Sequence, residues 1–367
     1  RSCFEDNWIT EGPKAAEFSD KLLDLIGSKY GVFAPTGTLS LYLALRAMGI
    51  GPGDEVIVPA ISWSTTYYPL QQYGLKLRFV DVELDTLNID TTQLQAALTP
   101  KTKAIVAVSI LGNPANLTAV RAFADEHGLY FLEDNCESLD AELPGKSGGQ
   151  KTGTFGDIGT FSFFFSHHIS TGEGGMLITD DAELDALARA VRAHGWIRDI
   201  PDGLDLFEEG EDSFAEAYRF VIPGYNLRAQ EFNGAAGLEQ LKKLPAMTER
   251  RRANLALFQD AFGDDGCFMI QRENGKSSSF CFPMIVKPDC GLERADVFGP
   301  LEEADIGFRM ITGGNFPRHD AIQYFDYDIV GDLANADIAH DRGFFVGNHP
   351  FDLSQQIARL RDVFNKL

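Results

Sequence analysis

Residues 161–175 bring several chemically active side chains together in one short segment. Two adjacent histidines, His167 and His168, follow an aromatic and serine-containing run, and the segment ends in Gly172-Glu-Gly-Gly175. Neighbouring histidines point in different directions, so they do not form the metal site that an i, i+4 pair on a helix forms. Taken alone, either histidine has an ordinary structural explanation, and the glycines are too common to identify a function.

Two acids form a second candidate site, because Glu133 and Asp134 end the apolar run that begins at Tyr130. In open α/β sheets, ligands bind at the carboxyl ends of strands. A buried carboxylate at that position needs a partner, and a protonated pyridine nitrogen is one such partner. Taken alone, the pair is better explained as a helix N-cap or a surface acid.

Two more segments follow strands. Thr36-Gly37-Thr38 leads from a strand into a helix, where backbone N–H groups and hydroxyls bind phosphate well, although capping by Thr36 or Thr38 is the simpler interpretation. Trp63 follows the strand that ends at Val58. An indole there either stacks on a planar cofactor or packs in the core.

Strand-like and helical segments alternate along the first two-thirds of the chain. This spacing indicates βαβ units and a mostly parallel sheet, which would bring residues after the strands to one edge. We expect strands at Glu55–Val58, Leu77–Val80, Ala104–Val108, Tyr130–Leu132 and Met176–Thr179, and helices at Leu39–Met48, Thr92–Leu98, Leu117–His127 and Asp181–His194.

The rest of the chain has a different pattern. The acidic stretch Asp199–Asp212 indicates a mobile loop, and Leu227–Leu257 is rich in helix formers. From about Phe258 the pattern is mixed α/β. A length of 367 residues suggests two domains, so we predict a large domain at 1–250 and a small C-terminal domain at 251–367.

Composition excludes several classes of function. The net charge is −22, which argues against general binding to nucleic acid or to an anionic membrane. No apolar run reaches the roughly 18 residues of a membrane span, and no signal peptide is visible. The five cysteines are scattered and contain no CxxC pair. We therefore expect reduced thiols, no metal site and a cytoplasmic location.

Together and in this order, the segments resemble the StrS/DegT family of sugar aminotransferases, over nearly the whole chain. The resemblance implies the α/β fold of type I pyridoxal-phosphate (PLP) enzymes, in which a large domain has a mostly parallel central sheet flanked by helices and a smaller α/β domain follows. It rests on Thr36-Gly37-Thr38, Pro52–Pro59, Glu133-Asp134, Ser162–Gly175 and Gly224-Tyr-Asn226.

One position departs from the aminotransferase pattern. In the family, the Ser162–Gly175 stretch carries the lysine that binds the cofactor covalently, and a gap-free match puts His167 there. The paired histidines resemble the dehydratase branch that acts on GDP-4-keto-6-deoxy-D-mannose in the synthesis of colitose, a sugar of lipopolysaccharide O-antigen. Further similar stretches are Trp63–Tyr67, Gln71–Gly74, Leu111–Pro114, Arg192–Trp196 and Phe345–His349.

The resemblance also implies roles for individual residues in a homodimer with shared active sites. Asp134 would pair with the pyridine nitrogen, Trp63 would stack on the ring, and Glu137 would lie near the ring hydroxyl. Gly37, Thr38 and Ser162 would hold the phosphate, Asn226 would reach in from the partner subunit, and His194, Arg198 and Tyr218 would line the substrate side, some of them across the interface.

Imidazole lacks the amine needed for the covalent link but is a suitable base near neutral pH, with a reference pKa of about 6.5. The resemblance thus implies that His167 is the base of a 3-dehydratase. Its cofactor would alternate between PLP and pyridoxamine phosphate, with L-glutamate as amino donor and ammonia as a product. An iron–sulfur relative also carries a histidine here, but Cys267, Cys281 and Cys290 do not supply four cluster ligands.

Two other functions stay open. One is a sugar aminotransferase, with glutamate as amino donor, in which the base has changed. The other is a non-catalytic protein that binds PLP or a nucleotide sugar. The presence of Asp134, Trp63 and Ser162 argues against the non-catalytic protein, because a site that has lost its activity has no need of residues that bind the cofactor ring.

Overall fold

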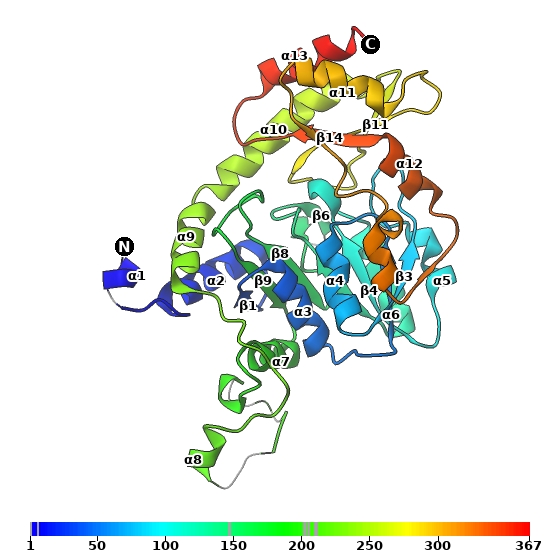
Figure 1. Ribbon diagram of the computed structural model, residues 1–367. Coiled ribbons are helices and arrows are strands. Elements are labelled where there is room, and N and C mark those ends of the chain that lie inside the picture. Colours follow the sequence, from blue (N-terminus) through cyan, green and yellow to red (C-terminus); the bar gives the residue numbers. More distant parts are fainter. Residues whose placement is uncertain (1, 6, 146–147, 201–203, 205, 209–211) are drawn as a thin grey trace.

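The computed structural model describes residues 2–5, 7–145, 148–200, 204, 206–208 and 212–367. Its largest part is an eight-stranded sheet with the order β1-β9-β8-β5-β4-β2-β3-β13 (Figure 1). The strands are β1 (Tyr30–Ala34), β2 (Glu55–Pro59), β3 (Lys76–Val80), β4 (Thr102–Val108), β5 (Tyr130–Asp134), β8 (Ile158–Ser162), β9 (Gly175–Thr179) and β13 (Tyr327–Ile329).

The sheet is mostly parallel, as predicted, and β9 is the exception. It pairs antiparallel with both β1 and β8. Because β9 lies beside β8, no crossover helix joins the two strands. The connection, residues 163–174, therefore stays at the edge where β8 ends, and this is the segment that carries the two histidines.

Helices cover both faces of this sheet, as fully buried parallel strands such as β2 require. The side chains of α3, α4 and α7 pack on one face, and those of α2, α5 and α6 pack on the other. These helices are α2 (Pro13–Ile26), α3 (Gly37–Ala47), α4 (Ser64–Gln72), α5 (Leu94–Ala97), α6 (Leu117–His127) and α7 (Ala182–Arg192). The short helix α1 (Ser2–Glu5) precedes them. A separate hairpin is formed by β6 (Glu142–Gly145) and β7 (Gly148–Lys151).

Two consecutive helices, α9 (Glu231–Leu241) and α10 (Leu244–Phe262), lead to a smaller antiparallel sheet (Figure 1). Phenylalanines from α10, the strands and α13 form much of its core. This sheet has the order β10-β11-β14-β12, with β10 (Phe268–Ile270), β11 (Cys281–Val286), β12 (Phe308–Arg309) and β14 (Gly343–Gly347), and its helices are α11 (Arg294–Glu303), α12 (Ala334–Arg342) and α13 (Ser354–Phe364).

The chain crosses between the two sheets more than once. The predicted boundary at residue 250 falls inside α10, and β13 returns to the large sheet, where it pairs in parallel with β3. The division into 1–250 and 251–367 remains a prediction. What the pairing establishes is that a segment from the C-terminal part completes one edge of the large sheet.

The described residues between 193 and 227 form an arm that projects below the large sheet in Figure 1 and contains α8 (Ser213–Glu216). Much of the predicted loop Asp199–Asp212 lies outside the described residues. The stretch Leu227–Leu257, rich in helix formers, predicts a helix that begins near Leu227, but α9 begins only at Glu231. Asn226 lies instead in an extended segment paired with Ala193, and so it neither opens nor caps a helix.

Candidate active site

A cleft of about 1780 Å³ lies between the large sheet and the small domain. The strand register explains why distant residues meet there. Gly175 is the partner of both Ala34 and Ser162, and Asp134 pairs with Thr160 two residues before the end of β8. The ends of β1, β5 and β8 therefore lie at one edge, and the residues that follow them line the cleft.

The two acids at the end of β5 point to opposite faces, as the two-residue period of a strand requires. Glu133 is fully buried and accepts hydrogen bonds from the backbone N–H groups of Gly153, Phe155 and Gly156, at 2.6–2.7 Å. Burial raises its pKa to about 7, although these hydrogen bonds oppose the shift. Glu133 thus stabilises a neighbouring turn, and only Asp134 faces the cleft.

Asp134 is held in place by two hydrogen bonds. Thr66 Oγ1 donates to Oδ2 at 2.7 Å, and the Cys136 N–H donates to Oδ1 at 3.2 Å. The Ser62 hydroxyl lies 2.7 Å from Thr66 Oγ1 and extends this polar chain. The carboxylate is 4% exposed and has no cationic partner among the described residues, so it can accept one from a ligand.

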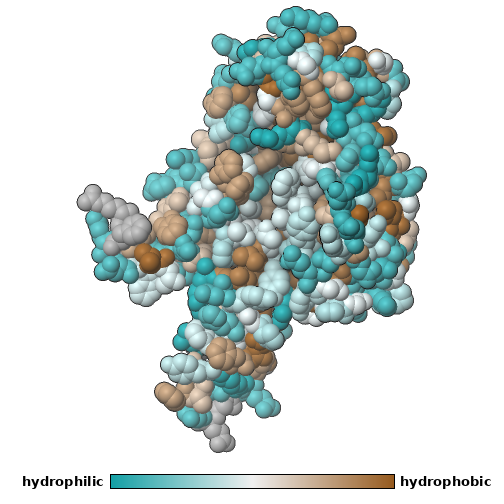
Figure 2. Space-filling view, in the orientation of Figure 1, coloured by the Kyte–Doolittle hydropathy of each residue, from teal (hydrophilic) through white to brown (hydrophobic). Residues whose placement is uncertain are grey.

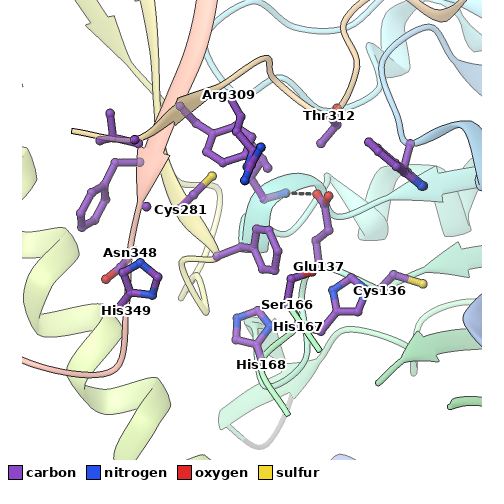
Figure 3. Close-up of a pocket in the computed structure, with 18 of the residues that line it drawn as sticks. Cys136, Glu137, Ser166, His167, His168, Cys281, Arg309, Thr312, Asn348 and His349 are labelled. Carbon is purple, nitrogen blue, oxygen red and sulfur yellow. Dashed lines mark hydrogen bonds between the residues drawn. The ribbon is translucent and has the colours of Figure 1, made fainter. Parts of the chain in front are cut away.

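Glu137, three residues beyond Asp134, is a second carboxyl group in the cleft (Figure 3). Its Oε2 accepts the Leu111 N–H at 2.8 Å. Burial raises its pKa to about 7, with a smaller contribution from the nearby Asp134 charge. Glu137 therefore exchanges a proton near neutral pH, which suits a group that shares a hydrogen with a phenolic oxygen.

The start of α3 is packed tightly against the end of β8. The Thr36 side chain accepts the Leu39 N–H at 3.2 Å, so the capping interpretation of Thr36 is confirmed. A Cβ atom on Gly37 would lie 2.6 Å from the Ser162 Cβ. A larger residue would force a shift here, and Gly37, Thr38 and Ser162 all line the cleft where α3 begins. This arrangement fits a phosphate group.

Trp63 occupies the position before α4. Its side chain is 60% exposed and lines the cleft. The core alternative is therefore wrong for this indole, and its free face is available to a planar ring.

The two histidines of the 163–174 connection have different surroundings (Figure 3). His167 is half-buried and lines the cleft, and its Nδ1 has no hydrogen-bond partner among the described residues. Burial lowers its pKa to about 4, so the ring is neutral at pH 7 and can accept a proton. His168 is 4% exposed, and its Nε2 lies 3.2 Å from the Ser278 carbonyl oxygen.

None of the described residues that line the cleft is a lysine. The donor set nevertheless fits PLP: a helix start with hydroxyls for the phosphate, Asp134 for a protonated ring nitrogen, and Trp63 for the ring face. The small-domain wall adds Arg294, Arg309 and Arg359.

Four predicted residues do not line this cleft: Asn226, His194, Arg198 and Tyr218. They gather on the arm. The Arg198 guanidinium lies 3.5 Å from the ring centre of Trp196, and the His194 ring lies 4.9 Å from it. Asn226 Oδ1 accepts a hydrogen bond from Arg228 at 3.2 Å, and Tyr218 is largely exposed. Within one chain the structure thus separates these four from the other predicted site residues.

The arm also exposes aromatic side chains in this single chain (Figure 2). Phe214 is 77% exposed, and Phe220 and Tyr225 are each 58% exposed. Exposed apolar groups clustered in this way usually mark an interaction surface.

Two residues that support the site have little or no signal in the sequence. Thr66 lies within the Trp63–Tyr67 segment, and a threonine on the first turn of the helix that follows a strand is a weak signal for such a contact. Phe280, whose ring lies 5.8 Å from the rings of both His167 and His168, has no signal in the sequence, because more than 110 residues separate it from them.

Two further findings concern the described residues only. No helix among them is both long and apolar enough to cross a membrane. They also contain no group of three or more His, Cys, Asp or Glu side chains suited to holding a metal ion.

Comparisons with known proteins agree with this site. The model of the DegT/DnrJ/EryC1/StrS aminotransferase family matches residues 1–361. GDP-4-keto-6-deoxy-D-mannose 3-dehydratase of Yersinia pseudotuberculosis is 44% identical over 99% of this chain and 93% of its own.

Two solved structures are also similar. The Escherichia coli GDP-4-keto-6-deoxy-D-mannose 3-dehydratase with bound hydrated PLP is 42% identical, covers 99% of this chain and 94% of its own, and has a TM-score of 0.93. A structure of this enzyme with a trapped PLP–glutamate geminal diamine is 42% identical, covers 99% and 95%, and has the same TM-score. The fold prediction, that of type I PLP enzymes, is confirmed by these matches.

Proposed function

This chain belongs to the DegT/DnrJ/EryC1/StrS aminotransferase family, and we propose that it is a PLP-dependent 3-dehydratase of GDP-4-keto-6-deoxy-D-mannose with L-glutamate as amino donor. One observation carries the proposal: His167 lies in a cleft that fits PLP, where none of the described lining residues is a lysine. The names of relatives that are 44% and 42% identical over almost the whole chain supply the substrate.

The geometry of the cleft supports the following contacts with the cofactor. Gly37, Thr38 and Ser162 hold the phosphate at the start of α3, and Asp134 keeps the pyridine nitrogen protonated. Trp63 covers one face of the ring, and Glu137 lies beside the ring hydroxyl. When bound, PLP supplies the electron sink for the reaction. The protein supplies orientation and proton transfer.

His167 acts as the base. Its ring is neutral at pH 7 because burial lowers the pKa to about 4, and the side chain lines the cleft. A neutral imidazole accepts a proton, whereas it offers no amine for a covalent link to PLP. The net reaction removes the oxygen at C3 of the sugar, converts glutamate to 2-oxoglutarate and releases ammonia.

The active site is completed in a homodimer. The cleft of their own chain is not lined by His194, Arg198, Tyr218 or Asn226, and the arm that carries them exposes aromatic side chains. Insertion of the arm at the partner's cleft would cover that surface and bring cationic and hydroxyl groups to a nucleotide sugar. Arg309 and Arg359, which form no ion pair with a described residue, add positive charge on the small-domain wall. All five cysteines are free, as suits a cytoplasmic enzyme.

Product stoichiometry tests the proposal. The purified protein is incubated with PLP, L-glutamate and GDP-4-keto-6-deoxy-D-mannose, and ammonia and 2-oxoglutarate are measured. A dehydratase releases both in equal amounts, whereas an aminotransferase forms 2-oxoglutarate and an amino sugar without ammonia.

The matched variants are His167→Asn and His127→Asn. His127 ends α6, outside the cleft. Loss of a positioned base typically lowers the rate about 10²- to 10⁴-fold, so only the first variant should lose ammonia release. Equal activity of the two variants would refute the assignment of His167.

A further inference from the structure

His168 is the buried neighbour of the base, and its hydrogen bonding identifies its tautomer. A carbonyl oxygen only accepts hydrogen bonds, so Nε2 must carry the hydrogen in its 3.2 Å contact with the Ser278 oxygen. Nδ1 is buried without a partner among the described residues. Burial, together with the charges of Arg251 and Arg252 on α10, lowers the pKa of His168 to about 3. His168 is therefore neutral. Its Nε2–H is committed to the Ser278 oxygen and its Nδ1 is buried, so neither ring nitrogen is available to act as the base.

The segment that receives this hydrogen bond, Ser277–Phe280, is fixed from several sides. Arg252 Nε donates to the Ser277 oxygen at 2.9 Å, and Arg251 Nη1 donates to the Phe280 oxygen at 3.0 Å. Asn348, next to β14, donates to the Ser279 oxygen at 3.2 Å. The small domain thus holds this segment rigidly.

The same segment reaches the large-domain side of the cleft. The Phe280 N–H donates to the Leu111 oxygen at 2.9 Å, and the Leu111 N–H donates to Glu137. The Phe280 ring lies 5.8 Å from each histidine ring, at 45° to His167 and 53° to His168. One aromatic side chain therefore forms a wall shared by both histidines.

We propose that His168 is a positioning residue: its hydrogen bond to Ser278 anchors the 163–174 connection to the Ser277–Phe280 segment and so holds the His167 ring against Phe280, facing the cleft. His168 then orients His167. A base on a strand-to-strand connection needs such support, because a displacement of the base by about 1 Å lowers the rate up to about 100-fold. The inference rests on the proposed function only for its kinetic part.

The first test needs no cofactor and no activity. The chain has seven histidines, and in the ¹⁵N-histidine-labelled, cofactor-free protein the two signals are assigned through their loss in His167→Asn and His168→Gln. His168 should keep the Nε2–H tautomer without titrating between pH 8 and 5. His167 should titrate far below 6.5, because burial is the cause of its lowered pKa.

The variants His168→Gln and His168→Met separate the hydrogen bond from packing. Glutamine keeps an N–H donor at a similar reach, whereas methionine fills space without a donor. In His168→Met the His167 ring loses its anchor and gains solvent, so its pKa should rise toward 6.5. In His168→Gln the pKa of His167 should stay low.

Kinetics provide the second readout. We expect His168→Met to lower kcat for ammonia release about 10- to 100-fold with little change in KM, and we expect His168→Gln to recover most of the loss. If His168→Met leaves both the His167 titration and kcat unchanged, or if glutamine is as damaging as methionine, the proposal is wrong. If the titrations behave as expected while the wild-type protein releases no ammonia, the positioning role holds and the proposed function fails.

Discussion

The contact between Gly37 and Ser162 gives a quantitative test of the phosphate site. In Gly37→Ala the new Cβ would lie 2.6 Å from the Ser162 Cβ, whereas an ordinary contact begins at 3.4 Å, so one side must retreat by about 0.8 Å (3.4 − 2.6). Alanine is the better helix former by up to about 1 kcal/mol, but overpacking costs about 1–3 kcal/mol. The clash should therefore outweigh the helix propensity.

Relief of this clash moves either Ser162 or the first turn of α3, and both contribute to the proposed phosphate site. We therefore expect the cost to appear in cofactor affinity, as a roughly 5- to 150-fold weaker Kd for PLP. Absorbance titration of the cofactor-free protein with PLP measures the affinity, and thermal melting without PLP measures any separate loss of stability.

Gly51→Ala is the matched control, because a Cβ on Gly51 meets nothing within 4 Å and its φ is not in the left-handed region. It should bind PLP as tightly as the wild-type protein. If Gly37→Ala also binds PLP with wild-type affinity, the start of α3 and the end of β8 do not form the phosphate site, and the reasoning from their close packing is refuted.

Four further predictions follow from the site. Borohydride treatment with PLP should leave the intact mass of the protein unchanged, whereas a stable phosphopyridoxyl adduct on a lysine would contradict non-covalent binding. Asp134→Asn should slow both the glutamate and the sugar half-reactions in single-turnover assays, and a loss in neither would show that Asp134 serves only its hydrogen bonds to Thr66 and Cys136. Mixing inactive His167→Asn and Asn226→Ala subunits should partly restore activity, because one shared site of each heterodimer carries neither lesion; confirmed subunit exchange without recovery would refute the role of Asn226 across the interface. Burial raises the pKa of Glu137 from 4.5 to about 7. Between pH 4.5 and pH 7 the folded chain therefore holds a proton that the unfolded chain has lost. The free energy of unfolding consequently falls as the pH rises from 4.5 to about 7. Glu137→Gln should reduce that fall in the melting temperature of the cofactor-free protein, and an unchanged pH dependence would mean that the folded protein already holds Glu137 ionised.

Sequence patterns determined the features of this protein that depend on neighbouring residues. The βαβ alternation predicted the strands β2 to β5, because buried parallel strands are continuous apolar runs separated by helices. The motif order also predicted the family, and the exchange of lysine for His167 predicted the departure from aminotransferase chemistry. Asn226 shows the limit of such patterns: the expected helix is displaced because the backbone of Tyr225 and Leu227 pairs with Val191 and Arg192.

Tertiary structure alone decided which side chains face the cleft and what holds them there. The sequence presents Glu133 and Asp134 as an equivalent pair, and likewise His167 and His168. Of the two acids only Asp134 lines the cleft, whereas both histidines line it, and the ring of His168 is held by the distant backbone of Ser278. The partners that make this difference, such as Gly153 and Ser278, come from other segments, and Ser278 is 110 residues away from His168. A local pattern contains no information about such partners, because only folding brings them within the few ångströms over which a hydrogen bond acts.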